Sequence, residues 1–164
     1  MKNKYIVLTG LIAFFMVAAS FTAYKSTATK KYKCMIQMIN YTGEKAYVVT
    51  SLMTPDGKYE KTLNVLGDDE EWYSDLPKWW SFSNGINEDI DAITGATIGN
   101  GERHISILEI DEEKIDAGYT IRFETAVENQ EYYSKDVEIP LQSSTIRNKV
   151  NGSGYIRYVR MIPN

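Results

Sequence analysis

The sequence has very little cysteine and histidine, and it has no excess of positive charge. It contains one cysteine and one histidine among 164 residues, so an internal disulfide is impossible and no Cys/His set for zinc, iron–sulfur or haem can be assembled. Acidic residues outnumber basic residues by 22 to 18, for a formal net charge of -4. This balance argues against a nucleic-acid partner, because phosphate binding needs a dense basic face.

Catalytic and metal-binding patterns are equally scarce. A Ser-His-Asp triad would have to use His104, and no nucleophile motif surrounds that residue. The acidic runs 68–71 and 111–113 lack the alternating oxygen spacing and the glycine of a calcium loop, so they indicate solvated charge. We therefore expect a carrier or binding module that has no catalytic residues and no metal site.

The beginning of the chain is its most apolar part. Lys2 and Lys4 precede a nearly uninterrupted apolar run over residues 5–21, and small residues near Ala19 resemble a signal-peptidase site. This pattern predicts export to the periplasm or extracytoplasmic envelope by a signal peptide over residues 1–23, followed by a polar linker over 24–31. The alternative is an uncleaved anchor, since the run is long enough to cross a bilayer as a helix. In that case the segment would be the chain's only contact with the membrane.

Residues 32–164 have the pattern of one β domain. Tyr, Val, Ile and Thr dominate residues 32–41 and 45–54, and such residues suit strands. The turn Pro55-Asp56-Gly57-Lys58 makes residues 45–66 a hairpin. No long amphipathic helix is visible, and Cys34 in the first strand is expected to be buried. Together with the later strand signals at 104–110, 119–127, 137–141 and 155–162, the pattern predicts an all-β, antiparallel, immunoglobulin-like sandwich of about eight strands.

Three tryptophans, Trp72, Trp79 and Trp80, lie within nine residues of each other. This segment can form at most a short helical turn near Pro77. Its aromatic side chains either complete the core at an open end of the sandwich or form a stacking wall for a planar ligand, and we favour the core. Residues 84–101 show no periodicity, which predicts a long functional loop.

The motif Asp91-Ala92-Ile93-Thr94-Gly95-Ala96-Thr97 lies in this loop. It resembles the covalent flavin attachment motif of extracytoplasmic redox subunits such as those of sodium-pumping quinone reductases. The resemblance implies that a flavin transferase joins FMN to Thr97, while Asp91 and Thr94 fix the loop by hydrogen bonds and Gly95 and Ala96 keep its backbone slim. No His or Lys adjoins Thr97, so Thr97 would be a substrate and not a catalyst. The alternative is a hydrogen-bonded turn that closes the sandwich.

A second resemblance covers residues 32–141. The segments Asp56-Gly57-Lys58, Asp75-Leu76-Pro77-Lys78-Trp79-Trp80 and Ala117-Gly118-Tyr119, together with the motif, look like an uncharacterised family of predicted bacterial periplasmic proteins. Members of this family often occur beside membrane redox proteins and flavin transferases, so the resemblance implies a sandwich and a link to envelope flavin or iron chemistry.

Two hypotheses follow. In the first, the protein is an extracytoplasmic electron-transfer accessory protein that carries FMN covalently on Thr97, with Trp72, Trp79 or Trp80 shielding the ring. In the second, it is a cofactor-free sandwich that binds a partner protein or a small ligand through the tryptophans and the 84–101 loop.

Overall fold

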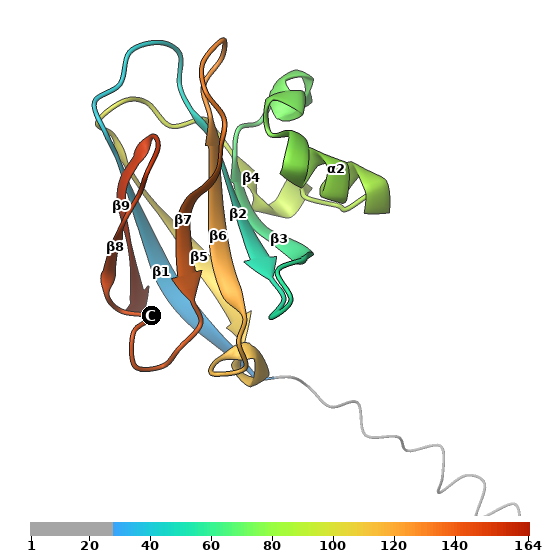
Figure 1. Cartoon of the computed structure of the whole chain (residues 1–164), viewed down its shortest axis with the longest axis vertical. Helices are drawn as coiled ribbons and strands as arrows, with labels where there is room; N and C mark the ends of the chain where they lie inside the picture. Colours follow the sequence, from blue (N-terminus) through green and yellow to red (C-terminus); the bar gives the residue numbers. More distant parts are fainter. Residues whose placement is uncertain (1–27) are drawn as a thin grey trace, which may run out of the picture.

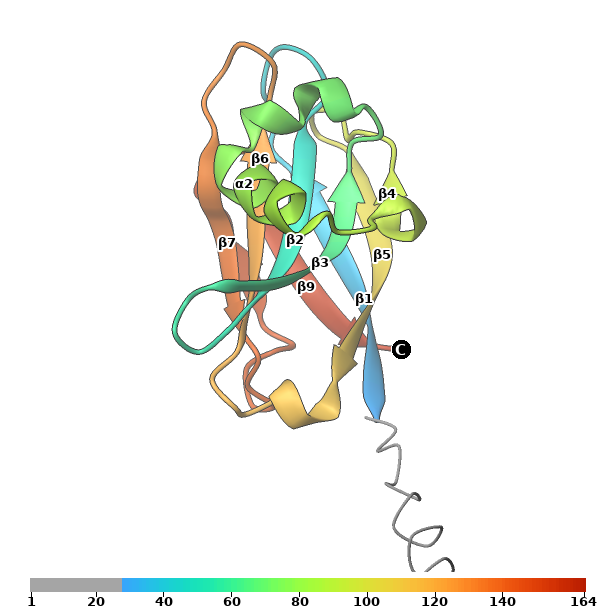
Figure 2. The ribbon, with the colours of Figure 1, turned by 90° about the vertical axis from the view of Figure 1, so that its right-hand side faces the viewer.

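Two β-sheets pack face to face in a sandwich (Figures 1 and 2). A computed structural model describes residues 28–164, so the predicted signal segment and half of the predicted linker lie outside the described residues. Residues 29–31, which we expected in the linker, belong to the first strand. The predicted sandwich is confirmed, with nine strands in place of about eight. Within residues 28–164, no helix has the length and apolar character needed to cross a membrane.

The smaller sheet has four antiparallel strands in the order β5-β1-β9-β8. Its central strand β1 is the longest and pairs with β5 on one side and β9 on the other. The short strand β8 was not predicted. The bounds are β1 Thr29–Met38, β5 Arg103–Asp111, β8 Lys149–Asn151 and β9 Ile156–Pro163.

The larger sheet has five strands in the order β4-β3-β2-β6-β7. The predicted hairpin over 45–66 is confirmed as β2 and β3, and Gly57 closes its turn with a φ of 80°. The pairing of β4 with β3 is parallel, so two residues of the predicted 84–101 loop extend the sheet. The bounds are β2 Tyr47–Met53, β3 Tyr59–Leu66, β4 Thr94–Gly95, β6 Thr120–Ala126 and β7 Tyr133–Pro140.

The main core fills the space between the sheets. Strand alternation sends every second side chain inward, so β1 contributes Cys34, Ile36 and Met38, and β6 contributes Ile121 and Phe123. Cys34 is buried as expected, and burial raises the pKa of its thiol to about 12. The fold therefore holds its one thiol in an unreactive state.

A second core lies on the outer face of the larger sheet, where a helical segment covers it (Figure 2). The segment comprises the 3-10 helix η1 (Glu70–Asp75) and the helix α2 (Pro77–Ile86). The prediction of at most a short helical turn near Pro77 was wrong, because α2 spans ten residues. Leu76 and Trp79 bury themselves against Val49 and Val65 of the sheet, and this tertiary burial outweighs the weak helix propensity of the local sequence.

A buried carboxylate joins the two sheets at their open edge. Asp136 on β7 accepts hydrogen bonds from the Thr125 hydroxyl and from the backbone N–H groups of Ser153, Gly154 and Ile156, at 2.7–2.9 Å. Because β7 belongs to the larger sheet, whereas Ser153 and Gly154 lie in the β8–β9 turn and Ile156 begins β9, Asp136 holds one sheet to the other. A Cβ atom at Gly154 would lie 2.4 Å from the Tyr133 ring, so this turn needs glycine.

Candidate functional site

The flavin-motif residues lie at the edge of the larger sheet. The 3-10 helix η2 (Asp91–Ile93) leads into β4, and the Gly67 N–H donates a hydrogen bond of 2.6 Å to the Gly95 carbonyl. The Thr94 hydroxyl donates to the Ile90 carbonyl at 2.9 Å, which fixes the loop as the motif implied. The side chain of Asp91 is exposed, and the contacts of residues 28–164 do not include the loop-fixing hydrogen bond that we expected from it.

The middle of the motif is open to the outside. Ala96 is exposed, and no heavy atom lies within 4 Å of the position that a Cβ atom would take at Gly95. Neither crowding nor a positive φ therefore requires glycine at position 95. The fold leaves room here for another molecule to approach the backbone.

Thr97 is half-buried and lies on the wall of a pocket of about 280 Å³. The wall combines the β1–β2 loop, the start of β2, the helix η1, and the end of β6 with the loop after it, all of which meet at the end of the sandwich away from residue 28 (Figure 1). The lining residues are Glu44, Lys45, Tyr47, Trp72, Asp75, Thr97, Ala126 and Glu128.

The three tryptophans occupy three different environments. Trp72 lines the pocket together with Thr97. Trp79 is fully buried, and its indole N–H donates a 2.9 Å hydrogen bond to the Thr62 hydroxyl. The core interpretation is therefore confirmed for Trp79. Its ring has no exposed face that could contact a cofactor as we expected. Trp80 lines a separate hollow beside Glu70. Of the three tryptophans, the structure brings Trp72 to Thr97.

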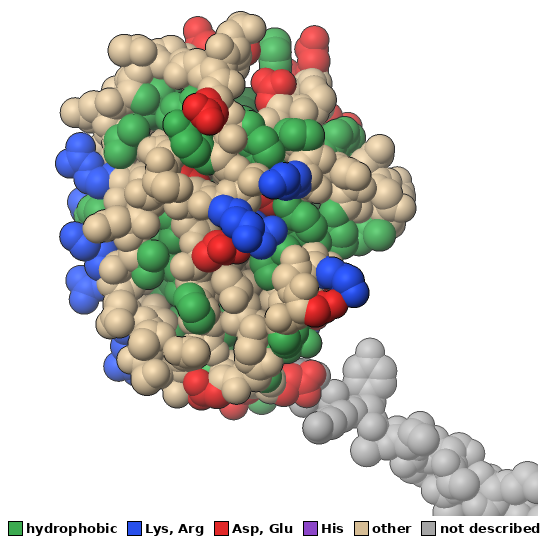
Figure 3. Space-filling view, in the orientation of Figure 1, with side chains coloured by type: hydrophobic (Ala, Val, Ile, Leu, Met, Phe, Trp, Pro, Cys, Tyr) green, Lys and Arg blue, Asp and Glu red, His purple; other side chains and the backbone are tan. Residues whose placement is uncertain are grey.

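Acidic side chains dominate the pocket. Glu44, Asp75 and Glu128 line it, and Lys45 is the one cation among its lining residues. Acidic side chains also gather on the surface at this end of the domain (Figure 3). Burial, followed by the nearby carboxylates Asp69 and Asp68, raises the pKa of Tyr47 to about 12, so its phenol stays neutral at physiological pH. Sequence reasoning missed these lining residues because they come from four separate segments.

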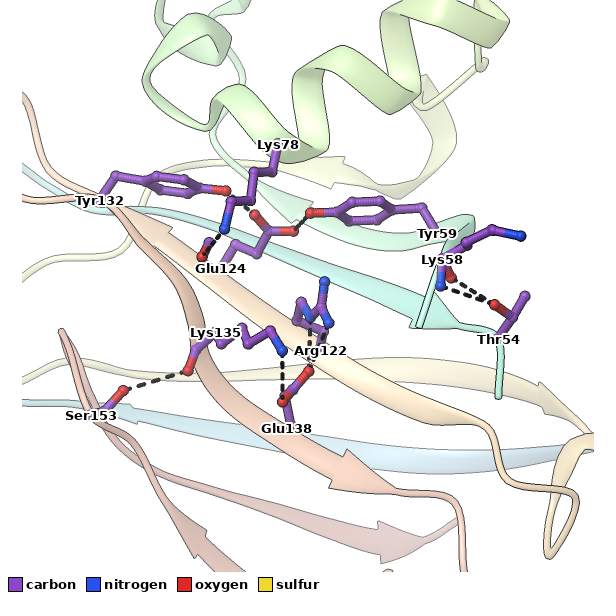
Figure 4. Close-up of polar contacts among 11 residues, drawn as sticks. Thr54, Lys58, Tyr59, Lys78, Arg122, Glu124, Tyr132, Lys135, Glu138 and Ser153 are labelled. Carbon is purple, nitrogen blue, oxygen red and sulfur yellow. Dashed lines mark hydrogen bonds and ion pairs between the residues drawn. The ribbon is translucent and has the colours of Figure 1, made fainter. Parts of the chain in front are cut away.

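A second polar cluster lies beneath α2 (Figure 4). Glu124 of β6 is fully buried and accepts hydrogen bonds from the phenols of Tyr59, at 2.5 Å, and Tyr132. Burial raises the pKa of the Glu124 carboxyl. Arg122 lies over the Tyr59 ring at 5.6 Å and forms an ion pair of 2.9 Å with Glu138. The polar groups of the cluster find their partners inside the fold. The cluster therefore stabilises the packing of β3, β6 and the start of β7.

No group of three or more His, Cys, Asp or Glu side chains within residues 28–164 could hold a metal ion. The pocket beside Thr97 is the candidate site for an organic ligand or a covalent group because of the side chains that line it. It combines a hydroxyl, two aromatic residues, one cation and three carboxylates.

The chain matches a protein family over most of the described residues. A family model described as "Predicted periplasmic protein (DUF2271)" matches residues 29–158, a range that covers all strands except the last part of β9. No curated protein and no solved structure matches the chain.

Proposed function

Because the chain belongs to the DUF2271 family of predicted periplasmic proteins, we propose that it works outside the cytoplasm as a carrier of FMN joined covalently to Thr97. The observation that carries this proposal is the position of Thr97. It lies on the wall of a pocket that also contains Trp72 and Tyr47. The apolar segment over residues 5–21 supports export of the chain.

The volume, the aromatic residues and the one cation of the pocket fit such a group. The pocket volume of about 280 Å³ is close to the lower end of the range for small-molecule sites, roughly 300–1,000 Å³. Trp72 and Tyr47 provide aromatic surface for a planar ring, and Lys45 provides a positive charge for a phosphate. The flavin would supply the redox chemistry, while these side chains would position it and limit its contact with water.

The surroundings of Thr97 also suit modification by a second protein. Exposed Ala96 and open space at Gly95 allow a transferase to approach the backbone. In the proposed transfer, the Thr97 oxygen bonds to the flavin phosphorus as the bond from that phosphorus to the rest of a nucleotide-flavin donor breaks. The hydroxyl proton passes to a base of the transferase, whose metal stabilises the developing charge. In this scheme the chain is the substrate of that enzyme and would then serve a membrane redox partner.

A second candidate function is cofactor-free binding of a cationic ligand or partner in the same pocket. The three carboxylates Glu44, Asp75 and Glu128 favour it, because they attract a cation and repel a phosphate. A cationic probe such as spermidine should then bind in isothermal titration. A Glu128→Gln variant should bind it more weakly.

Co-expression with a flavin transferase separates the two functions. If Thr97 carries FMN, the purified chain will fluoresce on a denaturing gel under ultraviolet light, and its intact mass will increase by one FMN group. Thr97→Ser, which retains a hydroxyl, should be modified, whereas Thr97→Val, which has the same shape without the hydroxyl, should not. An unmodified mass, obtained while a control substrate of the same transferase is fully modified, would rule out the carrier function.

A further inference from the structure

Positive charge is concentrated in the four-stranded sheet, although the chain as a whole is acidic. The strands β1, β5, β8 and β9 contain seven Lys or Arg residues and two Asp or Glu residues, against 18 and 22 in the full sequence. Basic side chains line the edge of the molecule where β8, β9 and β1 lie (Figure 3, left). An uneven distribution of this kind indicates a surface that meets negative charge.

Strand alternation places these cations on the outer face of the sheet. Cys34 and Ile36 point into the core, so Lys33 points outward. Lys33 lies between Ile107 and Ile162 on the neighbouring strands, and Arg160 lies beside Lys149. We call this surface the basic face and define it by Lys33, Ile105, Ile107, Lys149, Arg160 and Ile162.

The basic face is also the most apolar exposed surface of the described residues. Ile105, Ile107 and Ile162 are 57%, 46% and 41% exposed, and they are three of the four large hydrophobic side chains that are exposed in residues 28–164. The outer face of the other sheet is covered by α2, whereas no element of residues 28–164 covers this one (Figure 1). Aliphatic side chains clustered on an open sheet face indicate a binding surface.

The two acidic residues of these strands do not neutralise the basic face. Both lie near the end of β5, where Glu109 forms an ion pair of 2.6 Å with Lys31 and Asp111 forms one of 3.5 Å with Lys114. The cations farther along the sheet, Lys33 and Arg160, are exposed. Their charge is therefore available to a partner.

We propose that the basic face docks on the surface of an anionic lipid bilayer. Cations interspersed with exposed aliphatic side chains are the combination that binds the headgroup region, where the cations meet acidic lipids and the aliphatic groups reach the acyl boundary. A hollow of about 500 Å³ near the start of β1 has room for an anionic headgroup, and Arg147 on its wall provides a cation. This proposal does not depend on flavin at Thr97.

The sequence places a bilayer within reach of the basic face. The apolar run ends at Phe21 and β1 begins at Thr29, so residues 22–28 span at most about 25 Å when fully extended. A chain that keeps this segment in the membrane would hold the basic face close to the lipid surface. Docking would then give the protein a second membrane contact, beyond the N-terminal segment that the sequence suggested.

A fluorescent probe on the basic face tests the proposal in the full chain. Ile107→Cys is labelled with a polarity-sensitive dye, since native Cys34 is buried and does not compete. In vesicles containing phosphatidylglycerol, we expect a blue-shifted emission that lipid-borne quenchers reduce. Ser81 is exposed on α2, which covers the opposite sheet. The same dye at Ser81→Cys should keep the emission of a water-exposed probe with and without vesicles.

Charge reversal on the basic face is a second test, and the same charge reversal elsewhere is its control. Lys33→Glu/Arg160→Glu should weaken the affinity for anionic vesicles, read from the dye signal, by at least about 25-fold. Each cation near an anionic surface contributes about fivefold in affinity, and the variant removes two. Lys58→Glu/Lys135→Glu changes the net charge by the same amount away from the basic face and should leave the signal intact. A probe at position 107 that responds equally in phosphatidylcholine vesicles, or that is insensitive to the first double variant, would overturn the proposal. So would binding of the basic face to an acidic protein without any response to vesicles.

Discussion

Replacement of Asp136 by asparagine is the sharpest test of how the two sheets are held together. The Asp136 carboxylate is buried, and it accepts four hydrogen bonds, two at each oxygen. An asparagine can keep its oxygen toward Ser153 and Gly154. Its amide nitrogen then faces the Ile156 N–H, which cannot turn away and loses its acceptor.

The expected loss follows from that geometry. One buried N–H without an acceptor costs about 1–3 kcal/mol, and two hydrogen bonds that lose a charged acceptor weaken by roughly 0.5–1 kcal/mol each. The total is about 3 kcal/mol of the free energy of unfolding. With a urea m-value of about 2 kcal/mol/M for a domain of this size, the unfolding midpoint should fall by about 1.5 M.

Urea unfolding followed by tryptophan fluorescence measures this shift. Asp68→Asn, which makes the same chemical change at an exposed position, should leave the midpoint within about 0.3 M of the wild-type value. A shift of less than about 0.5 M for Asp136→Asn would refute the inference that this carboxylate joins the sheets.

Three other predictions concern buried groups. Trp79→Ala should lower the free energy of unfolding by about 4 kcal/mol, because Trp79 is fully buried. Trp72→Ala should cost less, because Trp72 is half-buried. Equal losses in a urea titration would contradict the placement of Trp79 in the second core. Burial holds the folded-state pKa of Glu124 above its ordinary value of 4.5, so its contribution to stability is fully present below that value and is lost as pH rises through the folded pKa. The urea unfolding midpoint of Glu124→Gln should therefore increase relative to that of the wild type as the pH rises through the folded-state pKa. The exposed variant Glu113→Gln should show no such increase. Cys34 should resist a thiol reagent in the native protein and react once per chain in denaturant; rapid native labelling would contradict its burial.

Much of the fold could be predicted from local patterns. The alternation around Cys34 in β1, the turn at Gly57 and the alternating residues of β6 each depend on a period of two or on a preferred turn conformation, which neighbouring residues encode. The sequence by itself therefore determined the all-β class, the hairpin and much of the main core. It also determined which threonine would be the candidate for modification, since the motif is contiguous.

Tertiary structure decided how these pieces meet. The length of α2 depends on contact between Trp79 and Val65 on the sheet, and the parallel pairing of β4 arises only where residues 94–95 reach β3. The same holds for the pocket, in which Trp72 and not Trp79 approaches Thr97. Local sequence encodes backbone periodicity and turn geometry, whereas a pocket and a cross-sheet hydrogen bond join residues far apart in the chain, so they exist only after the sheets have packed.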